Sequence, residues 1–116
     1  MTMRAMILAS ILTATGALTV SAAEPIEGTW LRPSTGTLVT FAPCAGGFCG
    51  TVQNGDYAGQ SIGTMAGSGA SYSGSITDLA EDKTYKGKAA VDGNAMELEG
   101  CVLGGLICRG ETWQRQ

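Results

Sequence analysis

The C-terminal stretch carries the residues most able to do chemistry, because polar and aromatic side chains recur there at every second position. They are Arg109, Glu111, Trp113 and Arg115. In an extended strand this spacing places all four on one face. Such a face could form an internal ion pair between Arg109 and Glu111, or it could contact a polar ligand at the mouth of a barrel.

Groups for catalysis are scarce in this chain. The sequence has no histidine, so it lacks the most common general acid or base, and its cysteines are expected to be oxidised. Asp78, Glu81 and Asp82 cluster in one expected turn, without the alternating ligands of an EF-hand calcium loop. We therefore expect no enzyme activity, no cofactor and no bound metal.

The four cysteines form two close pairs, Cys44 with Cys49 and Cys101 with Cys108. In an exported chain this pattern indicates two disulfides. Three connectivities are possible, and we favour the two local ones because each pair brackets a glycine-rich turn. The spacings do not fit a CxxC redox motif, and no histidine is present to help form a zinc site.

Residues 1–23 are typical of a secretory signal peptide, with Arg4, an apolar stretch and then Ser21-Ala22-Ala23. Cleavage after Ala23 would leave one domain, residues 24–116, in the periplasm or outside the cell, with no membrane-spanning segment. Without Arg4 the formal net charge of −3 becomes −4. That charge argues against a nucleic-acid partner.

Residues 24–116 predict an all-β domain with no large helix. Asp92-Gly93 is a strong two-residue hairpin signal. Pairing outward from it predicts two charge pairs on the outer face and an apolar or small inner face. The expected outer pairs are Lys86 with Glu99 and Lys88 with Glu97, and the expected inner pairs are Val91 with Asn94, Ala89 with Met96 and Gly87 with Leu98.

The neighbouring hairpins agree on which face is interior. A loop at residues 79–82 sets Ile76 opposite Tyr85 and Tyr72 opposite Ala89, and the pairing of Cys101 with Cys108 sets Leu98 opposite Glu111 and Met96 opposite Trp113. Consecutive hairpins with one apolar face indicate an antiparallel meander. With about eight strands it can close into a small up-and-down barrel.

Three motifs together resemble the bacterial exported family known as domain of unknown function 2147. They are Gly28-Thr29-Trp30, Cys44-x4-Cys49-Gly50 and the ending GC-x6-CR-x3-W-x-R. The likeness extends over roughly residues 26–115, although the segment 53–63 is shorter here than is usual in the family. The resemblance implies a small exported β-barrel and brings no established activity.

The Gly-x-Trp opening and the late arginine also resemble lipocalin-like barrels, in which the tryptophan packs across the closed end under the arginine. This resemblance implies that Trp30 and Arg115 close the barrel, while the alternative is that Trp30 forms part of a ligand pocket. The residues that we regard as candidates for the lumen or a ligand are Trp30, Tyr72, Tyr85, Arg109, Glu111, Trp113 and Arg115.

A second hypothesis concerns residues 66–72, AGSGASY, which are similar to the Ser-Gly-Ser-Gly-x-x-Tyr motif of periplasmic lysozyme inhibitors. That similarity implies that Ser68 would enter the lysozyme cleft, while the alternative is a plain hairpin tip. The sequence thus predicts a non-catalytic barrel of the bacterial envelope that binds a small molecule or an envelope protein. The alternatives are a protein inhibitor acting through Ser68 and a purely structural role.

Overall fold

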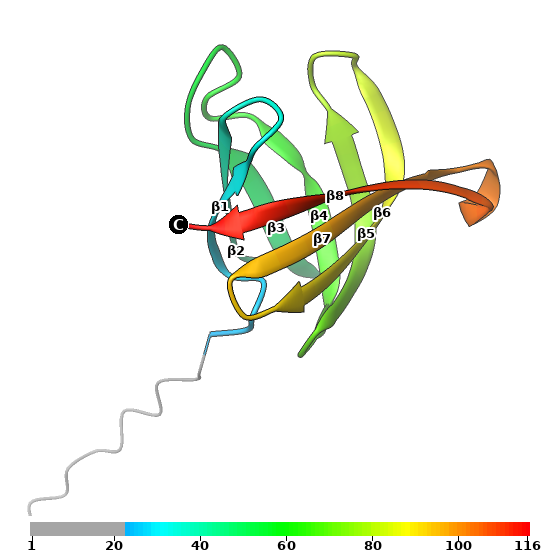
Figure 1. The fold of residues 1–116 in the computed structure, drawn as a ribbon, viewed down its shortest axis with the longest axis horizontal. Helices are drawn as coiled ribbons and strands as arrows, with labels where there is room; N and C mark the ends of the chain where they lie inside the picture. The colour runs from blue at the N-terminus through cyan, green and yellow to red at the C-terminus, as the bar shows by residue number, and fades with distance from the viewer. Residues whose placement is uncertain (1–22) are drawn as a thin grey trace, which may run out of the picture.

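The structure is a computed structural model that describes residues 23–116, and the predicted signal peptide therefore falls almost entirely outside the described residues. Within that range eight antiparallel strands form a closed barrel in chain order (Figure 1). The predicted fold class is confirmed. The strands are β1 (Gly28–Arg32), β2 (Thr37–Cys44), β3 (Gly47–Val52), β4 (Ser61–Ser68), β5 (Ser71–Asp78), β6 (Lys83–Asp92), β7 (Ala95–Val102) and β8 (Ile107–Arg115).

A short 3-10 turn, η1 (Leu103–Gly105), lies between β7 and β8. In residues 23–116 we find no helix with the length and apolar character needed to cross a membrane.

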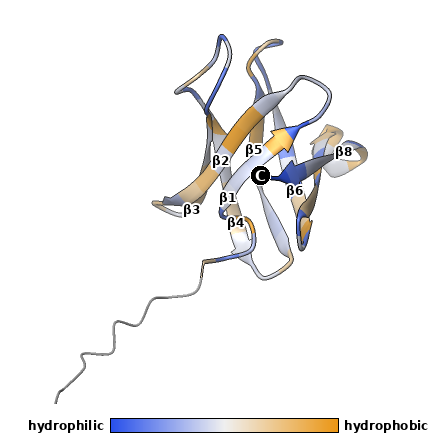
Figure 2. Cartoon of the chain, turned by 60° about the vertical axis from the view of Figure 1, so that its left-hand side comes forward, coloured by the Kyte–Doolittle hydropathy of each residue, from blue (hydrophilic) through white to orange (hydrophobic). Residues whose placement is uncertain are grey.

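Alternation of side chains along each strand builds the core. On β6, Gly87, Ala89 and Val91 are buried while Lys86 and Lys88 are exposed, as period-two strands in a closed barrel require. The interior is apolar, and the described residues include no buried charged or polar residue. Figure 2 shows a hydrophobic stretch along β2. The largest fully buried side chains are Trp30, Phe41, Ile26, Met65, Met96 and Val39.

The predicted register of β6 against β7 is wrong by two residues. Asp92 pairs with Ala95, so the two-residue loop is Gly93-Asn94 rather than Asp92-Gly93. Gly93 has a φ of 58° and takes the first central position, where one of the common two-residue hairpin turns places glycine. A shift of two residues keeps every side chain on its predicted face.

The shift does change which side chains lie opposite one another on the outer face. Lys88 faces Glu99, whereas Lys86 faces Cys101 and Glu97 faces Ala90. Only one lysine–glutamate pair is therefore opposed, instead of the two that we predicted. On the inner face the observed pairs are Val91 with Met96, Ala89 with Leu98 and Gly87 with Gly100.

The other predicted pairings across neighbouring hairpins are confirmed. Tyr72 lies opposite Ala89 and Ile76 opposite Tyr85, and β8 places Trp113 opposite Met96 and Glu111 opposite Leu98. Disulfides join Cys44 to Cys49 and Cys101 to Cys108, as predicted. Bonds of this kind indicate an oxidising, exported environment.

The barrel closes along a short seam between β1 and β8. That seam has two register pairs, Trp30 with Arg115 and Leu31 with Gln114, whereas β5 and β6 share a ladder from Ser71–Ala90 to Asp78–Lys83. The up-and-down order puts the β1–β2, β3–β4, β5–β6 and β7–β8 connections at one end of the barrel (Figure 1). The N-terminal segment and the other three turns lie at the opposite end.

Candidate functional site

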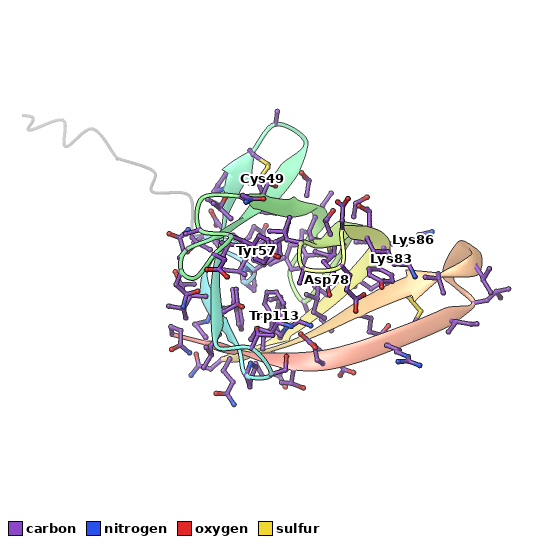
Figure 3. The ribbon with its side chains drawn as sticks, turned by 90° about the horizontal axis from the view of Figure 1, so that it is seen from above. Cys49, Tyr57, Asp78, Lys83, Lys86 and Trp113 are labelled. Carbon is purple, nitrogen blue, oxygen red and sulfur yellow. A yellow bond between two sulfur atoms is a disulfide. The ribbon has the colours of Figure 1, made fainter. Side chains whose placement is uncertain are left out.

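The end of the barrel that carries the β1–β2, β3–β4, β5–β6 and β7–β8 connections opens into a cavity of about 850 Å³, within the usual size range of small-molecule sites. We call this cavity the mouth. Figure 3 looks onto the molecule from above, with Tyr57, Asp78 and Trp113 labelled at three parts of the lining. The apolar inner wall of the mouth is formed by Val39, Val52, Ile62, Leu98 and Trp113.

The opposite end of the barrel is closed around Trp30. Its side chain is fully buried, and its indole N–H donates to the carbonyl of Ile26 at 2.9 Å. The guanidinium carbon of Arg115 lies 4.3 Å from the centroid of the Trp30 ring, and Arg115 Nη1 donates to the carbonyl of Glu27 at 2.8 Å. Trp30 and Arg115 therefore fasten the N-terminal segment beneath the barrel and do not line the mouth.

Tyr72 also lies at the closed end. Its hydroxyl donates to the carboxylate of Glu24 at 3.1 Å, and its ring packs edge-on against Phe48 with centroids 5.8 Å apart. Burial, and next the hydrogen bond with Glu24, raise the pKa of the Tyr72 phenol above its ordinary value. Of the seven predicted lumen or ligand residues, Tyr72, Trp30 and Arg115 are thus separated from the other four, which line the mouth: Tyr85, Arg109, Glu111 and Trp113.

Glu111 accepts hydrogen bonds from two side chains at the wall of the mouth. Nε of Arg32 donates to Oε1 of Glu111 and forms an ion pair with it, and Nη2 of Arg32 donates to Oε2 at 3.3 Å. The indole N–H of Trp113 donates to Oε1 at 2.7 Å. Because Arg32 is on β1 and Glu111 on β8, this pair continues the closure beyond the last paired residues of the seam.

The predicted buried pair between Arg109 and Glu111 is wrong. Arg109 is exposed, and within residues 23–116 it forms neither an ion pair nor a side-chain hydrogen bond. Residues two apart on a strand share a face but sit about 6.6 Å apart along it. The carboxylate of Glu111 is instead bound by a two-nitrogen fork from the adjacent strand, a geometry that arginine forms readily with carboxylates.

Sequence reasoning did not single out Arg32. The signal was present, because Gly28, Trp30 and Arg32 follow the same period-two face. It also missed Tyr57 and Lys83, which line the mouth from its loops and from the start of β6. Lys83 Nζ lies 5.5 Å from the ring centroid of Tyr85, so a positive charge lies beside the one tyrosine ring that β6 contributes to the mouth.

Two rim connections are held by side-chain to backbone hydrogen bonds. Asn54 accepts from the N–H of Leu38 at 2.9 Å and donates to the carbonyl of Gly36 at 3.1 Å, which fastens the β3–β4 loop to the β1–β2 turn. Asp78 accepts from the N–H groups of Ala80 and Glu81 at 3.0 and 3.2 Å. These contacts give the mouth a defined rim and occupy the Asp78 carboxylate with its own turn.

Among residues 23–116, one cluster of possible metal-binding side chains comes together, consisting of Glu99, Cys101 and Cys108. The two sulfurs are joined in a disulfide, and metal coordination requires the thiolate. The cluster therefore offers one carboxylate and no thiolate ligand.

Ser68 lies at the exposed tip of the β4–β5 hairpin, opposite Ser71. This tip is at the closed end of the barrel, away from the mouth. The N–H of the next residue, Gly69, donates to the carboxylate of Glu24 at 3.0 Å. The tip is thereby tied to the N-terminal segment that closes the barrel.

Comparison with known sequences and structures gives one match. The chain matches the family described as "Uncharacterized protein conserved in bacteria (DUF2147)" over residues 53–115. No curated protein and no solved structure matches. The matched range covers more than half of the chain and includes the second disulfide and all of β8. It begins after Gly28-Thr29-Trp30 and Cys44–Cys49, so it is shorter than the resemblance predicted from the sequence. The chain, itself a closed β-barrel, therefore belongs to this uncharacterised family of bacterial proteins.

Proposed function

We propose that the protein is a non-catalytic binding module of the bacterial periplasm or cell surface, and that its mouth holds a small amphiphilic molecule. The ligand would place an apolar body against the inner wall and an anionic group near Arg109. The observation that carries this proposal is Arg109 itself, a cation without a protein partner among the described residues, on the lining of an 850 Å³ cavity with an apolar wall.

The remaining charges of the mouth support an anionic rather than a cationic ligand group. Arg32 and Glu111 neutralise each other, and Asp78 accepts hydrogen bonds from its own turn. Arg109 and Lys83 are left facing solvent at the rim. The one other charged residue of the lining, Asp56, is exposed on the β3–β4 loop, so free positive charges outnumber free negative charges there by two to one. An arginine fork is suited to a carboxylate, sulfonate or phosphate oxygen pair.

The absence of histidine and the engagement of all four cysteines in disulfides support a binding role rather than a catalytic one. The mouth therefore has no imidazole and no free thiol, and its Glu111 and Asp78 carboxylates are engaged by Arg32 and by the Asp78 turn. The disulfides also support the proposed location, since such bonds persist in oxidising compartments.

The test uses two naphthalene probes of similar apolar bulk, anionic 1-anilinonaphthalene-8-sulfonate and neutral N-phenyl-1-naphthylamine. Both should bind and fluoresce, because both can cover the apolar wall. Arg109→Gln should weaken binding of the sulfonate about tenfold, the worth of one charge-assisted hydrogen bond, and leave binding of the neutral probe unchanged.

The matched control is Lys88→Gln, which removes a positive charge from the outer face opposite Glu99. It should leave binding of both probes at the wild-type level. Failure of the wild-type protein to bind either probe would overturn the proposal. Equal loss of both probes in Arg109→Gln would show that Arg109 supports the shape of the mouth rather than binding the anionic group.

A further inference from the structure

The β7–β8 turn exposes an unusual amount of apolar surface. Leu103, Leu106 and Ile107, which we call the apolar tip, are 69%, 86% and 52% exposed. They are three of the four large hydrophobic side chains that are exposed within residues 23–116. Concentrated apolar exposure of this kind marks interaction surfaces on soluble proteins, whereas scattered single residues do not.

The backbone of the apolar tip is braced in this exposed conformation. The Cys101–Cys108 disulfide closes its base, and the N–H of Leu106 donates to the carbonyl of Leu103 across the turn. Leu103 has a φ of 54°, in the left-handed region that bulky residues avoid. Such conformations cost free energy and persist where the surroundings enforce them, often at functional sites.

The apolar tip stands away from the rest of the barrel, because the hairpin of β7 and β8 projects beyond the neighbouring strands (Figures 1 and 3). The charges next to it are mainly positive. From residue 100 to residue 110 the one charged side chain is Arg109. Lys86 lies opposite Cys101, and the nearby Glu99 is opposed by Lys88. The acidic β5–β6 turn belongs to a different rim connection, where Asp78 lies opposite Lys83.

We infer that the apolar tip docks onto a lipid membrane surface that carries anionic head groups. Leu103 and Leu106 would enter the acyl region, while Arg109 and Lys86 would remain among the head groups. Apolar side chains flanked by basic residues are the combination that interfacial membrane anchors use.

The size of the apolar tip favours a bilayer over a protein partner. Three side chains on a narrow turn fall far short of the roughly 1,000 Å² that a specific protein interface buries. Reversible anchoring to a membrane needs only a small inserted apolar area together with basic residues. Ile107 and Arg109 also line the mouth, so docking would bring the mouth to the lipid surface.

The test is flotation of the exported, disulfide-bonded protein with vesicles of phosphatidylglycerol and phosphatidylethanolamine, or of phosphatidylcholine alone. The protein should float with the anionic vesicles, and less so at high salt. Leu103→Asn combined with Leu106→Ser should lower the partition about tenfold or more, because the inserted apolar area is lost. Asparagine is chosen at position 103 because it tolerates positive φ.

Two further variants separate docking from other effects. Lys86→Gln should weaken flotation and reduce its salt dependence, whereas Ala70→Ser, at a turn on the closed end of the barrel, should change nothing. The double variant should keep the wild-type melting temperature and still bind the neutral naphthalene probe, since neither leucine lines the mouth. Membrane docking can therefore be lost while probe binding is retained, and probe binding can be lost while docking is retained.

The inference would be overturned if the wild-type protein remained with the unbound fraction for both vesicle types. Equal flotation of the double variant would also overturn it. If the wild-type protein proved dimeric in sedimentation and the double variant monomeric, the apolar tip would join two copies of the chain instead of meeting lipid.

Discussion

Removing charge at Glu111 should reveal how the barrel seam is held. Glu111→Gln keeps an acceptor for the indole N–H of Trp113 but removes the ion pair with Arg32, whereas Glu111→Leu removes both interactions. The side chains of Arg32 and Glu111 are 31% and 37% exposed. Solvent therefore reaches both charges, and the pair should contribute about 1 kcal/mol or less, as surface ion pairs do.

The indole hydrogen bond should matter more. Trp113 is 4% exposed, so Glu111→Leu leaves a nearly buried donor without its acceptor, which costs about 1–3 kcal/mol. We expect destabilisation of about 1 kcal/mol for Glu111→Gln and about 2–3 kcal/mol for Glu111→Leu. In a domain of this size, 1 kcal/mol corresponds to a shift of about 4–8 °C in Tm.

The assay is urea unfolding of a double-mutant cycle, with Arg32→Leu and Glu111→Gln alone and together. The coupling energy should be about 0.5–1 kcal/mol. The parallel cycle with Arg109→Leu should give a coupling near zero, because Arg109 does not pair with Glu111. A larger coupling energy for Arg109 than for Arg32 would refute the assignment of Arg32 as the partner of Glu111. A coupling energy above about 3 kcal/mol would mean that the Arg32–Glu111 pair is excluded from solvent.

Three other results are expected. The raised pKa of Tyr72 keeps its phenol protonated in the folded state at a pH where the unfolded chain already ionises. The free energy of unfolding should therefore fall as the pH rises above 10.0, and Tyr72→Phe should reduce this fall in melting curves measured at several pH values. Replacing Cys101 and Cys108 together by serine should cost about 2 kcal/mol in urea unfolding, the entropy of a short closed loop, and an unchanged midpoint would contradict that value. The wild-type protein at micromolar concentration should not inhibit lysozyme, because the ligand site is proposed at the other end of the barrel from Ser68; inhibition that Ser68→Ala abolishes would favour the inhibitor hypothesis instead.

Much of the fold follows from period-two alternation, because this pattern assigns each side chain to a face. The Asp92-Gly93 signal located the β6–β7 turn and its faces, but it could not fix the turn to the residue. A shift of two leaves the apolar pattern unchanged, and glycine can occupy more than one position in a two-residue turn. The charge pairs were therefore displaced while the inner and outer faces stayed correct.

The site was harder to predict because it depends on contacts between the two ends of the chain. Pairing residues outward from a hairpin turn aligns strands that follow one another in the chain. It gives no information on how β8 pairs with β1. The partner of Glu111 is Arg32, on the far side of that seam, so sequence reasoning chose the nearby Arg109 on the same strand. The alternation pattern also does not show which end of the barrel an inward-facing residue occupies. For this reason Tyr72 and Tyr85 were both predicted as lumen or ligand residues, although they lie at opposite ends.

The short seam has a consequence for the order of folding. Every other strand pair joins neighbours in the chain and can form as soon as its second strand has been synthesised, since short loops close at low entropic cost. The seam must wait for Arg115, whose side chain covers Trp30 while the next residue, Gln116, donates its N–H to the carbonyl of Thr29. Until then the open edges of β1 and β8 are free to pair with other chains. A protein emerging from an export channel would thus remain vulnerable to aggregation until residue 115 has cleared it.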